Sequence, residues 1–123
     1  MHALRHVHEL LVPGGTLVDV HPVTEEQVEA AGRTIGVLEE PDWIAVVLPN
    51  AEARLRDAVQ DGLYAPEAER EFDLFQHFDD AEELIDANSD LLDSQPELVR
   101  RIRAARSPLR TREHYVGRRL RAT

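Results

Sequence analysis

The sequence predicts a single α/β domain over residues 1–123, with a mixed sheet of about three to five strands and about four helices. Three observations carry this prediction. Segments with helical spacing of apolar residues are interleaved with short β-branched or alternating segments, which is typical of α/β proteins. The length falls in the usual range for one domain with a modest core. No internal repeat and no flexible linker divides the chain.

The first segment combines a helix, a turn and a strand. Residues 2–11 place four apolar side chains on one helical face, namely Leu4, Val7, Leu10 and Leu11. The turn Pro13-Gly14-Gly15 ends this helix, because proline presets φ and glycine then supplies the positive φ of a type II turn. Residues 16–20 follow as a short strand that is apolar on both faces, which favours a buried strand of the parallel type.

The rest of the chain predicts one hairpin, three helices and two strands. These are a hairpin over 28–38 that turns at Gly32-Arg33, a helix over 42–61, a strand over 69–78, helices beginning at Asp79 and at Ser94, and a strand over 112–121. Pro49 is expected to kink or restart the first of these helices. Each of the other two starts with a capping residue three positions before a glutamate, Asp79 before Glu82 and Ser94 before Glu97.

The composition excludes several classes of function. The chain has no cysteine, which rules out disulfides, thiolate zinc sites and a cysteine nucleophile. No apolar run approaches the roughly 20 residues that span a bilayer, and the charged and polar N-terminus does not resemble a signal peptide. We therefore expect an acidic, cytoplasmic protein that has no membrane partner.

The charges are distributed unevenly along the chain. Residues 1–99 contain 5 arginines and 23 acidic side chains, whereas residues 100–123 contain 9 arginines and only Glu113. Such asymmetry is compatible with a nucleic-acid-binding tail or with a basic element that docks on an acidic one. The strong negative charge of the remainder would repel a polyanion. We therefore expect the acidic stretch 67–93 as the counterpart, within a subunit or between two, and no nucleic acid.

The segment from His2 to Pro22 resembles one part of the class I S-adenosylmethionine-dependent methyltransferases. In that family a helix ending in Leu-x-Pro-Gly-Gly leads into the fifth strand of a Rossmann-like sheet. The residues that match are Leu4, Val7, Leu10, Leu11, Pro13, Gly14, Gly15, Leu17 and Val18. The resemblance implies further helices, a sixth strand and an antiparallel seventh, for which residues 69–78 and 112–121 are the candidates.

The chain departs from the family where the cofactor binds. The family holds S-adenosylmethionine on a glycine-rich loop and on acidic and other residues that precede the Pro-Gly-Gly segment. The six glycines here form no such loop between a strand and a helix; they are Gly14, Gly15, Gly32, Gly36, Gly62 and Gly117. The resemblance thus implies the C-terminal half of a Rossmann-like methyltransferase fold, without a cofactor unless a separate half supplies it. Whether Met1 is the natural start is left open.

Candidate site residues lie at the end of the first predicted strand. Asp19, His21 and Pro22 occupy its carboxyl end, which the resemblance places on the substrate side of the cleft. Asp19 and His21 could act as base and orienter, but a polar pair that caps the strand or faces solvent is the preferred interpretation. We predict no catalytic, cofactor-binding or metal-binding residues. His2 and His6 have chelating spacing but lack a third ligand, and the acidic segments lack a calcium-loop pattern.

Three functional hypotheses remain. The first is a non-catalytic methyltransferase-like protein, either an interaction or regulatory module or a truncated remnant. The second is a component of a split methyltransferase that needs a separate cofactor-binding half. The third is a small-molecule-binding protein that uses the region around Asp19, His21 and the helix 42–61. Because the strand after Pro-Gly-Gly would have an exposed edge, we also expect a homodimer formed through the region Leu4–Val20.

Overall fold

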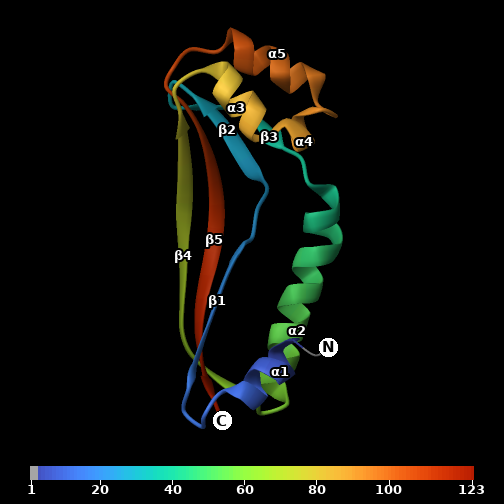
Figure 1. Ribbon diagram of the computed structural model, residues 1–123, viewed down its shortest axis with the longest axis vertical. Helices are drawn as coiled ribbons and strands as arrows, with labels where there is room; N and C mark the ends of the chain where they lie inside the picture. Colours follow the sequence, from blue (N-terminus) through green and yellow to red (C-terminus); the bar gives the residue numbers. More distant parts are fainter. Residues whose placement is uncertain (1–2) are drawn as a thin grey trace. The chain divides into compact units, whose positions relative to one another are not determined.

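The computed structural model describes residues 3–123, which form an α/β fold with one five-stranded sheet, as Figure 1 shows. Its elements are α1 (Ala3–Leu10), β1 (Thr16–Pro22), β2 (Glu26–Ala30), β3 (Arg33–Leu38), the π-helical segment η1 (Trp43–Val47), α2 (Leu48–Gln60), β4 (Tyr64–Phe78), α3 (Ala81–Ala87), α4 (Ser89–Leu92), α5 (Pro96–Ala104) and β5 (Leu109–Ala122). The α/β class is confirmed. A Rossmann-like identity does not follow from this architecture alone.

The chain divides into two compact units. Unit 1 comprises Met1–Val23, Pro41–Phe72 and Tyr115–Thr123, and unit 2 comprises Thr24–Glu40 and Asp73–His114. The long strands β4 and β5 contribute one part to each unit. The boundaries of the units therefore fall within secondary structure.

Unit 1 is a three-stranded sheet segment with helices on one face. β1 pairs antiparallel with β5 from Thr16 opposite Arg121 to Pro22 opposite Tyr115, and β4 pairs with β5 in the opposite direction (Figure 1). The buried core residues are Leu55, Ala58, Tyr64, Leu120 and Ala122, against which side chains of α1 and β1 pack. The hydroxyl group of Tyr64 donates a hydrogen bond of 2.7 Å to the carbonyl of Leu4, which fastens α1 to this core.

The two faces of β1 have an unusual polarity. Leu17, Asp19 and His21 point toward α2, because Leu17 packs on the core and His21 contacts Glu52 of that helix. Val18 and Val20 point the other way, with 62% and 51% of their surface exposed. An antiparallel strand with one solvated face normally carries its polar residues on that face. In β1 the outward face is apolar and the inward face carries the ionisable pair.

Unit 2 packs three helices against a hairpin. β2 and β3 pair antiparallel, and β2 also pairs with β5 from Gln27 opposite Arg112 to Ala30 opposite Leu109. The core residues of this unit are Val28, Ala30, Leu38, Phe78, Leu84, Leu92, Leu98, Ile102 and Leu109. The hairpin turns at Ala31-Gly32, one residue before the predicted Gly32-Arg33, and both turn residues have positive φ.

Several expectations about the elements need correction. The strand pairings with determined register are all antiparallel, so the predicted mixed sheet and the parallel-type strand over 16–20 are wrong. The reason is that β5 returns alongside β1, while a short turn joins β2 to β3, which permits only antiparallel pairing. The described residues also include five α-helices instead of about four, because the short helix α4 gives no periodic signal.

Both of the last two predicted helix starts are displaced by one residue. Asp80, not Asp79, caps α3, and its carboxylate accepts a hydrogen bond from the backbone N–H of Glu83. Gln95, not Ser94, precedes α5. Its side chain does not cap the helix but forms hydrogen bonds with the carbonyl of Val37 in β3 and with the N–H of Glu39 just after β3. The side-chain cap of α3 therefore lies one position later than predicted, with the Glu83 carboxylate accepting from the N–H of Asp79, and α5 has no side-chain cap.

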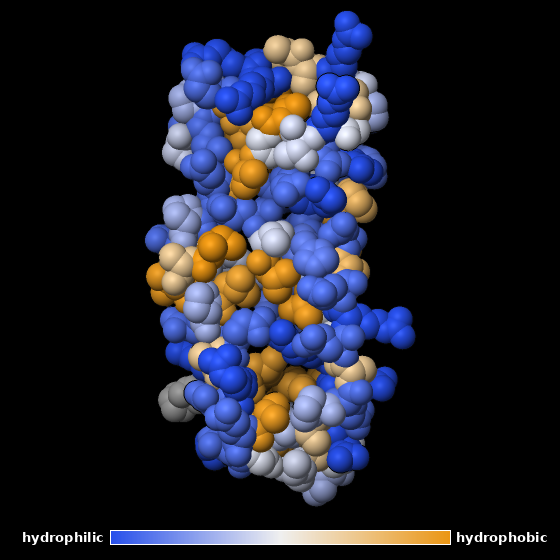
Figure 2. Space-filling view, turned by 180° about the vertical axis from the view of Figure 1, so that it is seen from behind, coloured by the Kyte–Doolittle hydropathy of each residue, from blue (hydrophilic) through white to orange (hydrophobic). Residues whose placement is uncertain are grey.

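No helix among the described residues is long and apolar enough to cross a membrane. Figure 2 shows that hydrophobic side chains nevertheless reach the surface at several places among hydrophilic ones. The largest exposed apolar residues of unit 1 are Leu10, Val12, Val18, Val20, Val46, Val47 and Phe72.

Candidate functional site

The turn before β1 positions the strand that carries the candidate residues. Gly14 adopts φ of +84°, which supplies the predicted positive φ after Pro13. The N–H of Gly14 donates to the carbonyl of Ala122, and the N–H of Ala122 donates to the carbonyl of Gly15, both at 2.8 Å. These bonds fasten the turn to the end of β5. The Pro13-Gly14-Gly15 segment thus fixes where β1 begins and in which register it pairs.

His21 lies between two carboxylates on the inward face of unit 1. Its Nδ1 is 2.7 Å from Oδ2 of Asp19, and its Nε2 is 2.8 Å from Oε1 of Glu52. The His21 side chain is only 12% exposed. A neutral imidazole has one N–H, so both contacts are complete only when both ring nitrogens carry a proton. The arrangement is a hydrogen-bonded bridge between β1 and α2.

Arg118 of β5 extends this bridge across the sheet. Its guanidinium contacts the Glu52 carboxylate at 3.0 Å and Oε1 of Glu69 at 2.6 Å. Asp19 is the register partner of Arg118, so alternation along β1 and β5 places both on the same face. Five side chains from three strands and one helix therefore form one network, Asp19–His21–Glu52–Arg118–Glu69.

The network shifts the pKa values of two of its residues, Glu52 and Arg118. Burial by itself would raise the pKa of Glu52, but hydrogen bonds and charge from His21 and Arg118 outweigh it and hold that pKa below its ordinary value of 4.5. Burial would likewise lower the pKa of Arg118, and its contacts with Glu69 and Glu52 raise it instead. The folded state thus favours the ionised forms of both groups.

A groove of about 410 Å³ lies beside the network in unit 1. Its walls are formed by side chains of α2, β4 and β5, namely Glu52, Leu55, Arg56, Val59, Gln60, Pro66, Glu69, Arg118 and Leu120. The polar end consists of Arg118 already paired with two carboxylates, and the remainder is largely apolar. Such a groove suits a small amphipathic molecule.

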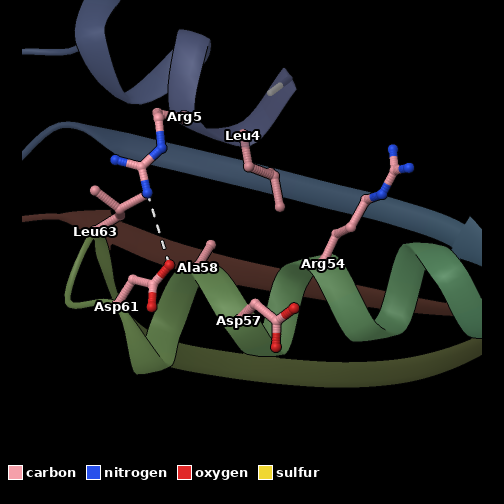
Figure 3. A pocket seen from close by; sticks show the side chains of 7 residues that line it. All are labelled: Leu4, Arg5, Arg54, Asp57, Ala58, Asp61 and Leu63. Carbon is pink, nitrogen blue, oxygen red and sulfur yellow. Dashed lines mark ion pairs between the residues drawn. The ribbon is translucent and has the colours of Figure 1, made fainter. Parts of the chain in front are cut away.

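A second, smaller notch of about 220 Å³ lies between α1 and α2. Figure 3 shows Leu4 and Arg5 of α1 facing Arg54, Asp57 and Asp61. Arg5 pairs with Asp61 at 3.7 Å, and both side chains are mainly exposed. Exposed ion pairs contribute little to stability, so this notch marks the docking of α1 and offers no enclosed site.

The structure brings together part of the predicted site. Asp19 and His21 are in contact, whereas Pro22 ends β1 opposite Tyr115 and has no role in the network. The arrangement does not offer His21 as a free base, because each ring nitrogen already faces a carboxylate. Sequence reasoning missed Glu52, Glu69 and Arg118. The only available signal was the charge asymmetry that paired the C-terminal arginines with residues 67–93.

That predicted pairing of arginines with acidic residues is confirmed within the chain. Arg118 pairs with Glu69, Arg119 with Glu67 and Arg103 with Glu82. His6, the other histidine candidate among the described residues, is separate from the network. His6 lies 3.9 Å from Glu9, and His2 lies outside the described residues. Over residues 3–123, no three His, Cys, Asp or Glu side chains are grouped so as to hold a metal ion.

No family model, curated protein or solved structure matches the chain.

Proposed function

We propose that this chain is a non-catalytic methyltransferase-like module of Rossmann-like type that acts by associating with polypeptides. The observation that carries the proposal is the inverted polarity of β1, whose valines face outward while its ionisable residues bridge inward to α2. A solvated sheet face gains nothing from two exposed valines, whereas an interface does. The methyltransferase-like part of the proposal is supported by the order of the elements in unit 1.

The order of elements agrees with what the resemblance implies. A helix and a Pro-Gly-Gly turn lead into β1, then helix α2, then β4, and finally β5 antiparallel to β1. The engagement of both His21 nitrogens supports a structural role for this histidine over a catalytic one. We further propose a cytoplasmic location, which the absence of cysteine suits, and a homodimer formed through α1 and β1.

A second candidate is a component of a split methyltransferase. The observation that favours it is the position of the groove on the helix-covered face of unit 1, which could hold part of a substrate when a separate cofactor-binding half is supplied. The same groove also supports the third candidate, a small-molecule-binding protein. Both candidates require ligand binding in or beside this groove, which the interaction module does not.

Calorimetric titration of S-adenosylmethionine into the purified 123-residue protein tests the proposal. A characterised class I methyltransferase, titrated under identical conditions, serves as the positive control. We expect no detectable heat from this chain. Binding at micromolar strength or better would overturn the non-catalytic assignment and would make the groove lined by Glu52 and Arg118 the first place to search for the cofactor.

A further inference from the structure

β1 has a free edge in unit 1. Within residues 3–123, β1 pairs only with β5 and stands at the end of the strand order. The hydrogen bonds between Ala122 and the Gly14-Gly15 turn fix which residues of β1 bond to β5, because in an antiparallel pair only every second residue of a strand bonds to a given neighbour. In β1 these residues are Leu17, Asp19 and His21. The backbone groups of Val18 and Val20 therefore face the free edge, where they have no partner strand.

Apolar side chains surround this edge. Val18 and Val20 are exposed on the outward face, next to Phe72, which stacks on Tyr115 at 5.8 Å between ring centroids. A Cβ atom at Gly117, the register partner of Val20, would lie 3.4 Å from Cε1 of Phe72 and 3.7 Å from Cγ2 of Val20, so the Phe72 ring and the Val20 side chain lie over this position on the same face. Before β1, Leu10 is 74% exposed although it belongs to the apolar side of α1. An apolar surface beside an open strand edge is typical of strand-addition sites.

We propose that this edge binds a second copy of the chain, with the two β1 strands antiparallel and Val20 on the two-fold axis. The inference rests on the proposed self-association and specifies its surface. Charge supports the choice of a second copy. Residues 3–22 contain only three side chains that are charged at neutral pH without counting histidine, Arg5, Glu9 and Asp19, although the whole chain carries a net charge of −10. Two copies therefore meet where like-charge repulsion is smallest.

The register follows from the residues along β1. With Val20 opposite Val20 of the other copy, Asp19 lies opposite His21 and Val18 opposite Pro22, each pair occurring twice. The Asp19 carboxylate and the His21 imidazole then face each other on the inward side, and apolar residues meet on the outward side. A register centred on Asp19 would place two carboxylates directly opposite each other. The pair at Val20 exchanges two backbone hydrogen bonds, and Pro22, which lacks an N–H, falls at the ends of the ladder.

Single-cysteine variants test this register cleanly, because the natural chain has no cysteine. In the proposed dimer the two Cα atoms at position 20 are about 5.5 Å apart, which suits a disulfide. The two at position 18 are separated by four residue spacings, about 14 Å, which forbids one. We therefore expect V20C to form a disulfide-linked dimer under mild oxidation, at least tenfold faster than V18C. V47C, which is exposed elsewhere in unit 1, is the matched control.

The outcomes separate this inference from the proposed function. Cross-linking of V18C but not V20C, in a protein that is dimeric by sedimentation, would overturn the Val20 register and leave the interaction module standing. Equal cross-linking of V18C, V20C and V47C would indicate random collision and would overturn the interface. A protein that is monomeric by sedimentation would overturn self-association itself. Heat from S-adenosylmethionine would contradict the proposed function without bearing on the register.

Discussion

His21 and Glu52 join the first strand to the long helix of unit 1 through a hydrogen bond of 2.8 Å between Nε2 and Oε1. Because Asp19 holds the other ring nitrogen, the imidazole is fixed on both sides. These two contacts explain why Asp19 and His21 lie on the inward face of β1. They give the network a stabilising role, and they leave the outward valines as the distinctive surface of the strand.

Replacing His21 with glutamine is predicted to lower the free energy of unfolding by about 1–3 kcal/mol. Two hydrogen bonds to charged groups are lost or weakened, and the carboxylates of Asp19 and Glu52 remain partly buried without the imidazole between them. Urea denaturation measures this loss. His6→Gln is the control, because His6 is exposed and contacts only Glu9 at 3.9 Å. Equal stability of the two variants would show that the bridge contributes nothing.

Local signals explain which parts of the fold could be predicted. The Pro13-Gly14 turn, the hairpin turn at Gly32 and the helix restarting at Pro49 each depend on backbone restrictions that act within a few residues. All three are found in the structure. The start of β4 at Tyr64 was missed, because its first residues, with Pro66 and several acids, show no apolar alternation.

The network was only partly predictable for a related reason. Asp19 and His21 are two residues apart on a strand, so their common face can be read from the sequence. Glu52 is one of several glutamates in its region, and nothing local indicates that it faces His21. Strand direction was also unpredictable, because it depends on the long-range return of β5 alongside β1.

The stability of the protein is predicted to depend on Glu52 in mildly acidic solution. The folded-state pKa of Glu52 lies below its ordinary value of 4.5, so folding favours the ionised carboxylate. Its contribution is fully present above the unfolded-state pKa and is lost as the pH falls through the lower folded-state pKa. Comparing urea unfolding of the natural protein and Glu52→Gln from pH 7 to pH 3 checks this. The difference between them should shrink as the pH falls, and a constant difference would refute the assignment.

Glu29 gives a separate prediction for unit 2. Its side chain is 7% exposed and contacts Arg110 at 2.7 Å and Arg112 at 3.0 Å. Glu29→Gln is predicted to lower the free energy of unfolding by about 1–2 kcal/mol. This is less than the loss of one partner of a fully buried ion pair, because both arginines are accessible to water and can be hydrated. Glu82→Gln, which breaks an exposed pair with Arg103, should cost less. Thermal unfolding that ranks the two variants in the reverse order would contradict this account of unit 2.

Gly36 tests the packing between the hairpin and α5. A Cβ atom at this position would lie 2.3 Å from Cδ1 of Leu98, which is buried in the core of unit 2. Gly36→Ala is therefore predicted to lower the free energy of unfolding by about 1–3 kcal/mol through overpacking. In a Leu98→Val background the same substitution should cost less. A double-mutant cycle with no coupling between the two positions would show that they do not pack as described.

Sedimentation velocity of the purified protein tests the central claim, that β1 presents an interaction surface, most directly. We predict a species of twice the 13.9 kDa chain mass at micromolar concentration. The double variant Val18→Thr/Val20→Thr, which keeps the β-branched shape but removes apolar surface, should weaken the dimer at least tenfold. The control variant Val46→Thr/Val47→Thr, with both positions on η1, should leave the dimer unchanged. A natural protein that sediments only as a monomer, at every concentration up to the millimolar range, would contradict the claim.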